Sequence, residues 1–570
     1  MKKLISTIFL IILVSGCSST GNVFSSKKVT SEYTLKSGGE LKELQKELVV
    51  KHVELHFEVF PKKKKLAGKA IYTFETNKSL TKMSLDLDRD FTINQIKYNN
   101  QVLVIDNYQN PQGELIITMP EQSDKIFTLS IDYEGKPHVA KRAPWDGGFV
   151  WSKTPDGHDW IATAVQLQGC DLFWPCIDHP LVEPETADIY ITVDKTLVAA
   201  SNGILQGVKE LNNKKTYHWR TLTPINNYAF SLNIGPYEEI KDTYQSIYGN
   251  TLDLVYYHLP RQDDKPKKLF AEIPVMLDFF ERVIGPFPFS QDKVGIVETP
   301  HLGMEHQTIN AYGNNYRKTG FGFDQLLQHE FAHEWFANQL TNNNPDHMWL
   351  QEGFGSYMQP LFAQYLQGER GYLGYLKNSR EGLINKFPLV SNKAQTIEEV
   401  YGKDKGPSGD IYAKGSLVLH TLRQLIGDQF FFTSIRELVY GTADPKPGNF
   451  KPRISDTQEF IQIVNDVTGK DYQWFFDVYV FQAPLPILEQ ERENSQIRLN
   501  WKTENDLSFP MPLDVSINGE IKTLAMQSKE LLIVHPKDIV IIDPMSKILR
   551  QEKAIDDFQA YKKKNEKKQK

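Results

Sequence analysis

Several sequence signals of common protein classes are missing from this chain of 570 residues. It has no G-x-S-x-G nucleophile elbow, no phosphate-binding G-x-x-x-x-G-K-[ST] loop and no complete G-x-G-x-x-G fingerprint. The formal net charge of −6 is small for this length, so the charge balance indicates no nucleic-acid partner. The composition, with 40% hydrophobic and 24% charged residues, is that of a globular protein, and the length suggests roughly three or four domains.

Cysteine is also scarce, because the chain contains only Cys17, Cys170 and Cys176. The last two are six positions apart, a spacing that fixes no geometry, so a disulfide and two buried thiols are both open. Neither arrangement makes a zinc site by itself.

Long apolar runs are missing too, apart from one at the amino terminus that extends from Leu4 to Val14. It is shorter than the roughly 20 residues that span a bilayer and follows two lysines, so it indicates an export signal over residues 1–16. The letters "VSGC" resemble the lipobox of bacterial lipoproteins, which implies a lipid on Cys17 and anchoring to the bacterial envelope; Ser18 resembles an outer-membrane sorting residue. An ordinary secretory signal is the alternative. Polar residues 17–45 are typical of a flexible tether.

Periodicity divides the rest of the chain into a multidomain α+β protein. Residues 46–240 mostly alternate between polar and apolar, as in "VELHFEV", which predicts a large antiparallel β domain. Residues 241–483 are mainly helical in pattern, as in "KKLFAEIPVMLDFFERVIG". Alternation returns over 484–550, which predicts a small β-sandwich-like domain, and the basic residues 551–570 are typical of a solvated, disordered tail.

The stretch "HEFAHEWFANQL" contains the strongest chemical signal in the sequence. His329 and His333 are four positions apart, so on a helix they lie on one face and can share one metal ion. Glu330 lies beside them and can reach a water molecule in such a site. A buried helix whose histidines bond to their neighbours is the alternative, and the motif alone does not exclude it.

A third ligand candidate decides between these interpretations. Catalytic zinc takes three protein ligands and keeps one position open. After His333, the glutamate in "WLQEGFGSYM" is Glu352, which begins a second apolar helix, where a buried charge needs a partner. We therefore predict that His329, His333 and Glu352 bind one Zn²⁺ ion.

These residues resemble the zinc aminopeptidases that include aminopeptidase N and leukotriene hydrolase. The similarity includes "HEFAHEWFAN" with "EGF" 18 residues later, "HLGMEHQTINAYG", "IYAKGSLVLHTLRQLIG" and "VQLQGCDLFWPCIDHP", in the family's order over roughly residues 45–490. Thermolysin-like endopeptidases also use two histidines and a glutamate, but one residue further apart. The resemblance implies a thermolysin-like, mostly helical catalytic domain.

The same resemblance assigns roles to individual residues. Glu330 is expected to act as general base and then general acid, and Tyr412 to donate its hydroxyl to the developing oxyanion. Glu305 is expected to pair with the free α-ammonium of a peptide, which would confine cleavage to amino termini. Backbone at Gly303 and Met304 and the Gln166 side chain are expected to help bind that amine.

Two positions depart from the family pattern, since His306 replaces an asparagine and Ala337 a glycine. His306 is expected to change how Glu305 is held, or to place a titrating group beside it. Members of the family usually end in a large helical domain, whereas the residues after 483 here have the pattern of strands. We therefore expect no enclosed chamber of the usual depth.

The function predicted from these residues is zinc-dependent removal of amino-terminal residues from peptides. A metalloendopeptidase, an epoxide hydrolase like the leukotriene enzyme, and a surface binding module without catalysis are the alternatives. A complete set of zinc ligands, with Glu330 and Tyr412, argues against the last of these. No motif indicates the preferred side chain, and the oligomeric state is open.

Overall fold

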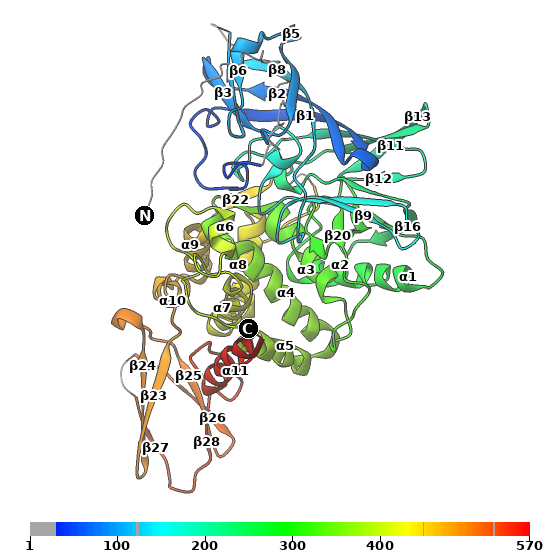
Figure 1. Cartoon of the computed structure of the whole chain (residues 1–570). Helices are drawn as coiled ribbons and strands as arrows, with labels where there is room; N and C mark the ends of the chain where they lie inside the picture. The colour runs from blue at the N-terminus through cyan, green and yellow to red at the C-terminus, as the bar shows by residue number, and fades with distance from the viewer. Residues whose placement is uncertain (1–29, 121–124, 449, 528–529, 570) are drawn as a thin grey trace, which may run out of the picture.

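The computed structural model describes residues 30–120, 125–448, 450–527 and 530–569. It is an α+β protein in which a β-rich N-terminal unit lies against a largely helical unit, with further strands near the C-terminus (Figure 1). The expected fold class is thereby confirmed. The predicted signal peptide and Cys17 lie outside the described residues. Within those residues, no helix has both the length and the apolar character needed to cross a bilayer.

The N-terminal unit is built from sheets that enclose an apolar core. Its described strands form an eight-stranded sheet in the order β13-β14-β11-β1-β2-β8-β4-β5 and two smaller sheets, β3-β7-β6 and β12-β15-β10-β9. Pairing is mostly antiparallel, as predicted, but β1 and β11 are parallel. The strands are β1 (Val49–Phe60), β2 (Lys65–Glu75), β3 (Lys82–Asp86), β4 (Thr92–Tyr98), β5 (Gln101–Val102), β6 (Tyr108–Gln109), β7 (Glu114–Thr118), β8 (Ile126–Gly135), β9 (Gly148–Lys153), β10 (Asp159–Ala164), β11 (Ala187–Asp194), β12 (Val198–Ala200), β13 (Ile204–Leu211), β14 (Lys214–Thr221) and β15 (Asn233–Gly235).

A sheet with the order β16-β17-β18-β20-β19 joins this unit to the helices. Along β17, Leu254 and Tyr256 pack into the core of the helical unit, while Val255 and Tyr257 pack into the core of the N-terminal unit. Because successive side chains of a strand point to opposite faces, the sheet is buried on both sides around β17, whereas its edge strand β16 is mostly exposed. Its strands are β16 (Glu238–Gln245), β17 (Thr251–His258), β18 (Val294–Glu298), β19 (Gly303–Met304) and β20 (Asn310–Tyr312).

Helices dominate the chain from residue 265 to 479, with a short parallel pair formed by β21 (Leu340–Asn342) and β22 (Arg453–Ser455). The longest, α4 and α7, pack against each other and against α5. The helices are α1 (Lys265–Phe270), α2 (Ile273–Val283), α3 (Gln325–Ala332), α4 (Trp349–Gln367), α5 (Glu369–Glu381), α6 (Ile397–Tyr401), α7 (Asp410–Ile426), α8 (Asp428–Tyr440), α9 (Thr457–Thr468) and α10 (Gln473–Tyr479).

The C-terminal strands form two three-stranded sheets among the described residues, β23-β24-β27 and β26-β25-β28. Their buried residues belong to the same apolar core as the helices. The bounds are β23 (Ile487–Glu493), β24 (Gln496–Lys502), β25 (Leu513–Ile517), β26 (Glu520–Leu524), β27 (Glu530–Ile533) and β28 (Val540–Ile542).

Two segments that were predicted to be flexible are ordered instead. Residues 30–45 of the predicted tether pack on the N-terminal unit, where the Gln45 amide donates to Asp86 at 2.8 Å and Lys42 forms an ion pair with the same carboxylate. The basic end forms helix α11 (Lys553–Gln569), in which Ile555 is buried and the Gln559 amide donates to the Leu383 carbonyl at 3.2 Å. The basic residues alone favour a solvated, disordered end. Packing of the helix through Ile555 stabilises it against that tendency.

Candidate metal and peptide site

Helix α3 and the residue that caps its end carry the H-E-x-x-H residues. Asp324 caps its first turn by accepting from the backbone amides of Leu326 at 3.1 Å and Leu327 at 3.2 Å. Regular α-helix ends at Ala332, and His333 is the capping residue of that end. The chain then continues through a π-helical segment, Glu334–Gln339, whose backbone leaves helical geometry at Phe336. This turn lets the Phe336 carbonyl reach Nδ1 of His333 at 2.9 Å.

The three predicted ligands meet in a compact cluster. The Nε2 atoms of His329 and His333 are 3.2 Å apart, and each lies 3.4 Å from Oε2 of Glu352 on α4. Among the residues described, this is the group of acidic, histidine and cysteine side chains whose ligand atoms lie close enough to hold one ion. Cys170 and Cys176 form a disulfide and take no part.

The donor set fits zinc. Oε2 of Glu352 is buried 3.4 Å from the two histidine nitrogens without a well-directed hydrogen bond, an arrangement that a cation between the three groups would satisfy. The contact of Nδ1 of His333 with a carbonyl keeps that nitrogen protonated, so Nε2 is the nitrogen that would bind metal, in place of its own proton. Two imidazoles and one carboxylate are a typical ligand set of catalytic zinc. The expected zinc triad is therefore supported by geometry and chemistry.

Burial and negative charge dominate the electrostatics of the cluster. Burial, reinforced by the neighbouring Glu305, raises the pKa of Glu330 well above its usual range. Burial acts to lower the pKa of His333, but the hydrogen bond and charge of Glu352, with Glu305 and Glu330, outweigh it and raise that pKa to about 10. The same field of carboxylates favours a divalent cation.

Glycines bring the site elements into contact. A Cβ on Gly353 of α4 would lie 3.1 Å from the Cα of Gly415, and a Cβ on Gly415 of α7 would lie 2.8 Å from the Cα of Gly353. These helices therefore touch backbone to backbone beside Glu352. On the other side, a Cβ on Gly303 of β19 would lie 2.4 Å from Oε1 of Glu330. Glycine is required there because the predicted base occupies that space.

Two tyrosines bind the second oxygen of Glu352. The Tyr412 hydroxyl, on α7, donates to Oε1 at 3.0 Å, and the Tyr401 hydroxyl at the end of α6 donates to the same atom. Tyr412 was predicted to lie in the site, and it does, although its hydroxyl contacts a ligand rather than open space. Tyr401 was missed, because nothing in its sequence neighbourhood distinguishes it from the other tyrosines.

Glu305 lies immediately after the edge strand β19 and is buried. Its Oε1 accepts hydrogen bonds from the Gln166 amide and from the Tyr228 hydroxyl, the latter at 2.9 Å. Gln166 was predicted from one motif to act here, and the structure places it on Glu305. Tyr228 was missed. Met304 packs with Ala164 and Ala311, so its predicted contribution rests on its backbone.

Comparison with known proteins agrees with this geometry. Residues 49–229 match the Peptidase M1 N-terminal domain and residues 295–479 match the Peptidase family M1 domain. The chain belongs to peptidase family M1. The resemblance to zinc aminopeptidases found in the sequence is thereby confirmed at the level of the family.

Relatives of this M1 chain are distant in sequence. It is 23% identical over 442 residues to "Probable aminopeptidase 2" of Sulfurisphaera tokodaii. The aligned region covers 72% of this chain and 53% of the relative. The chain is 22% identical over 442 residues to "Leucyl aminopeptidase" of Saccharolobus solfataricus, covering 72% and 52%. The chain thus spans about half the length of these relatives.

Solved structures show the same fold. An M1 zinc metallopeptidase from Deinococcus radiodurans, as a mutant bound to a Tyr-Ser-Ala substrate, superposes with a TM-score of 0.65 at 24% identity. The match covers 79% of this M1 chain and 96% of the other. A two-domain M1 zinc metallopeptidase mutant bound to L-arginine gives a TM-score of 0.63 at 22% identity.

His306, the departure from the family pattern, is fully buried in this M1 chain. Burial is the main cause that lowers the pKa of His306 to about 3, and repulsion from the nearby His301 adds to it. The side chain is therefore neutral at ordinary pH. Of the two expected effects, a titrating group beside Glu305 is therefore wrong. The loop is held from the other side instead, where the Asn338 amide donates to the Glu305 carbonyl and to Glu334, both at 3.1 Å.

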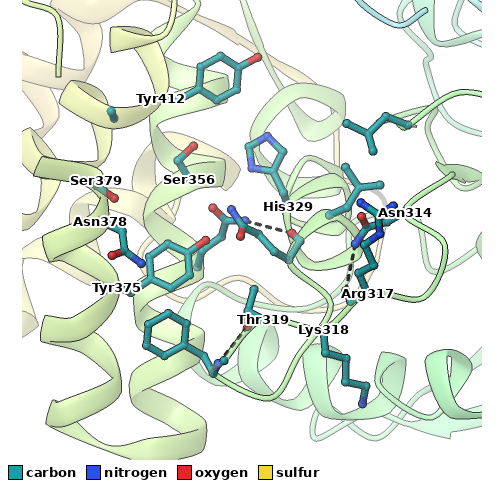
Figure 2. Close-up of a pocket in the computed structure, with 17 residues that line it drawn as sticks. Asn314, Arg317, Lys318, Thr319, His329, Ser356, Tyr375, Asn378, Ser379 and Tyr412 are labelled. Atoms are coloured by element: carbon teal, nitrogen blue, oxygen red, sulfur yellow. Dashed lines mark hydrogen bonds between the residues drawn. The ribbon is translucent and has the colours of Figure 1, made fainter. Parts of the chain in front are cut away.

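The metal cluster opens into a cavity of about 730 Å³, shown in Figure 2. His329 and Tyr412 line it at one end. Its walls come from the loop between β20 and α3 and from α3, α4, α5 and α7. Glu305, Gln166 and Tyr228 are not among its lining residues. The cavity therefore does not include the group formed by Glu305, Gln166 and Tyr228.

Proposed function

We propose that this chain is a zinc aminopeptidase that hydrolyses the amino-terminal residue from peptides. The observation that carries the proposal is the buried Glu305 carboxylate beside the zinc triad. Both of its hydrogen bonds end on Oε1, which leaves Oε2 for the α-ammonium of a substrate. Aminopeptidase relatives within the same family support this assignment.

Each side chain has a definable task in this reaction. When bound, zinc supplies Lewis acidity toward the scissile carbonyl and lowers the pKa of a water molecule in the site. Glu330 takes the proton of the attacking water and passes it to the leaving amine. Gly303 leaves room for this carboxylate, and a cation bound at the triad would oppose the effect of burial and of Glu305 and favour its ionised form.

Tyr412 and Tyr401 control the other side of the scissile bond. Both hydroxyls donate to Oε1 of Glu352, and Tyr412, which also lines the cavity, would donate its hydroxyl to the developing oxyanion. One such donor is worth roughly 2.7–4 kcal/mol in related chemistry. Glu305 fixes the amino end, and β19, an edge strand, offers backbone groups to an extended peptide.

A panel of aminoacyl chromogenic amides, each with a free and with an acetylated amine, tests the proposal. We expect hydrolysis of the free-amine compounds alone, and loss of that hydrolysis with a chelator or in Glu330→Gln. The Glu330→Gln protein should still bind one zinc ion per chain, since Glu330 is no ligand. Equal cleavage of the acetylated compounds would indicate an endopeptidase. No turnover by zinc-loaded protein would indicate a binding module.

We propose in addition that the chain is a lipoprotein, exported through residues 1–16 and anchored to the bacterial envelope, in the outer membrane, by a lipid on Cys17. The "VSGC" motif after an apolar run supports this. Expression with an alkyne-labelled fatty acid should label the wild-type chain and leave Cys17→Ser unlabelled. A soluble, unlabelled wild-type protein would support the ordinary secretory signal instead.

A further inference from the structure

The loop between β8 and β9, residues 136–147, lies beside the residues that hold Glu305. Ala143 of this loop packs against the small apolar cluster that contains Met304, and the Tyr228 side chain packs against the same cluster. The hydroxyl of that tyrosine donates to Glu305 at 2.9 Å. The loop is therefore a neighbour of the group to which the proposed function assigns the amino terminus of a peptide.

A second contact ties the loop to the segment that carries Gln166. The backbone amide of Gly147 donates to Oε1 of Gln168, and a Cβ on Gly147 would lie 2.6 Å from the same atom, so the two segments touch closely. Gln166, two positions earlier in the chain, donates its side-chain amide to Glu305. The loop thus has a defined position relative to both hydrogen-bond donors of Glu305.

This loop exposes a large aromatic side chain. Trp145 is 54% exposed and is the one tryptophan among the exposed large apolar side chains of the described residues. The guanidinium of Arg142 lies 4.9 Å from the centre of its ring, a cation–π contact that favours this orientation of the indole. Scattered apolar side chains on a surface are ordinary, but an accessible indole beside a polar binding group indicates a ligand contact.

The first residue of a bound peptide lies near this loop. Because the α-ammonium and the side chain leave the same Cα, the first Cβ lies about 2.5 Å from the nitrogen that Glu305 would bind. On the protein, Trp145 is two positions from Ala143, at most about 7 Å along the backbone. No residue precedes the amino terminus, so the peptide side chain closest to Glu305 is that of the first residue.

We propose that Trp145 contacts the side chain of the amino-terminal residue, so that peptides beginning with an aromatic or large aliphatic residue are the preferred substrates. The inference rests on the proposed aminopeptidase function and names the side-chain class of its substrates. An indole offers a flat apolar surface, and an aromatic pair is stabilised beyond the burial of its area. A methyl side chain is too short to use that surface.

Chromogenic amides that differ in their single amino acid test this contact. The ratio of kcat/KM between the phenylalanyl and the alanyl amide would be measured in the wild type and in Trp145→Ala. We expect a wild-type ratio above one that falls roughly three- to tenfold in the variant, the scale of one aromatic contact. The value for the alanyl amide should stay unchanged. Trp145→Phe keeps an aromatic ring and should retain most of the ratio.

A variant elsewhere on the surface provides the matched control. Phe430 of α8 is also an exposed aromatic residue, 41% accessible, and lies outside the lining of the cavity beside the metal cluster. Phe430→Ala should have the wild-type ratio. Circular dichroism and zinc content confirm that each variant is folded and carries its metal.

The outcomes separate this contact from the underlying function. An unchanged ratio in Trp145→Ala overturns the contact and leaves the aminopeptidase standing, including the case in which both amides lose activity equally because the loop only supports the residues around Glu305. An equal fall of the ratio in Phe430→Ala also overturns it. No hydrolysis of either amide by zinc-loaded wild-type protein removes the proposed function, and the tryptophan contact with it.

Discussion

The two carboxylates that face the site, Glu352 and Glu305, are supported from different parts of the molecule. Glu352 contacts His329, His333, Tyr401 and Tyr412, all of them on or beside helices of the catalytic unit. Glu305 receives its hydrogen bonds from residues of the N-terminal β unit, beyond the sheet that both units share.

This difference separates the residues of the metal cluster from the residues that hold Glu305. The metal cluster is complete within one unit and needs only the packing of α3, α4 and α7. In the proposed function, recognition of the amino end requires the N-terminal unit to lie correctly against the catalytic unit. Substitutions on the two sides should therefore affect different quantities, metal binding on one side and amine selectivity on the other.

Replacing the ligand Glu352 should have the largest effect. Glu352→Gln removes the anionic ligand and leaves two neutral imidazoles, so we expect substoichiometric zinc and a fall of kcat by 10³-fold or more, at least the scale of lost metal activation. Elemental analysis after dialysis and kinetics on leucyl amide measure both. Full zinc occupancy in this variant would contradict the assignment.

Replacing Glu305 should leave zinc in place and break recognition. Glu305→Gln removes the charge that pairs with the ammonium, a loss of about 2–5 kcal/mol for a buried charge pair. We expect kcat/KM on free-amine substrates to fall about a hundredfold and the discrimination against acetylated amines to shrink. If zinc is lost as well, the two sides are not separable.

The buried Lys414 predicts how the free energy of unfolding changes with pH. It is fully buried on α7, its Nζ donates to the carbonyls of Gln482 at 2.8 Å and Ala483 at 2.9 Å, and burial lowers its pKa to about 8. The unfolded chain binds this proton up to pH of about 10.5. Between these values the unfolded state holds more protons, so rising pH stabilises the fold, by at most about 3 kcal/mol.

In Lys414→Met this contribution is absent. We expect the unfolding free energy of the wild type relative to the variant to grow between pH 8 and 10, measured by chemical denaturation at each pH. A difference that stays constant over this range would show that Lys414 keeps its proton in the folded protein.

The glycine contact between α4 and α7 predicts a moderate effect on both fold and activity. In Gly415→Ala the new methyl group meets the Cα of Gly353, and overpacking of this kind costs about 1–3 kcal/mol. Because the helices must separate, Tyr412 should also lose its position on Glu352. Thermal unfolding and kcat measure the two. Gly409→Ala is the control, since its Cβ would meet no atom within 4 Å.

Two tyrosine variants should have the smallest effects, and each should change a different measured quantity. Tyr228→Phe and Tyr401→Phe each delete one hydroxyl that donates to a carboxylate, at a cost of about 1–2 kcal/mol. We expect Tyr228→Phe to raise KM about tenfold without changing zinc affinity. Tyr401→Phe should change zinc affinity, measured by competition with a chelator, and leave the amine selectivity intact.

The sequence predicted the parts of the site that follow local rules. His329, Glu330 and His333 follow from helical spacing, and Glu352 from a charge at the start of an apolar helix. Gln166 and Glu305 came from separate motifs, and their contact joins positions 139 apart. No local pattern contains such a contact, so the sequence indicated both residues but not the bond.

What the sequence missed depends on tertiary packing. Tyr228 lies in a short 3-10 turn (Asn227–Ala229) far from the catalytic motifs, and only the docking of the two units brings it to Glu305. The roles of Gly353 and Gly415 emerge only once α4 and α7 are in contact. The fold class followed from periodicity, but the parallel pairing of β1 with β11 did not. The alternation of polar and apolar residues within a strand does not depend on which strand it pairs with.

The segment before the first strand has a consequence for how the protein can be divided. The Ser37 carbonyl accepts from the backbone amide of Ile397, and the Gly39 carbonyl accepts from His179 of the N-terminal unit and from Asn344 of the catalytic unit, each at 3.2 Å. The bond to Asn344 closes a loop of 305 positions. Such long closures cost the most chain entropy, so we expect this bridge to form after both units have folded. A shortened chain that starts at residue 46 would lose this bridge and also the contacts of Lys42 and Gln45 with Asp86. We thus expect the first described residues of the polypeptide to dock last.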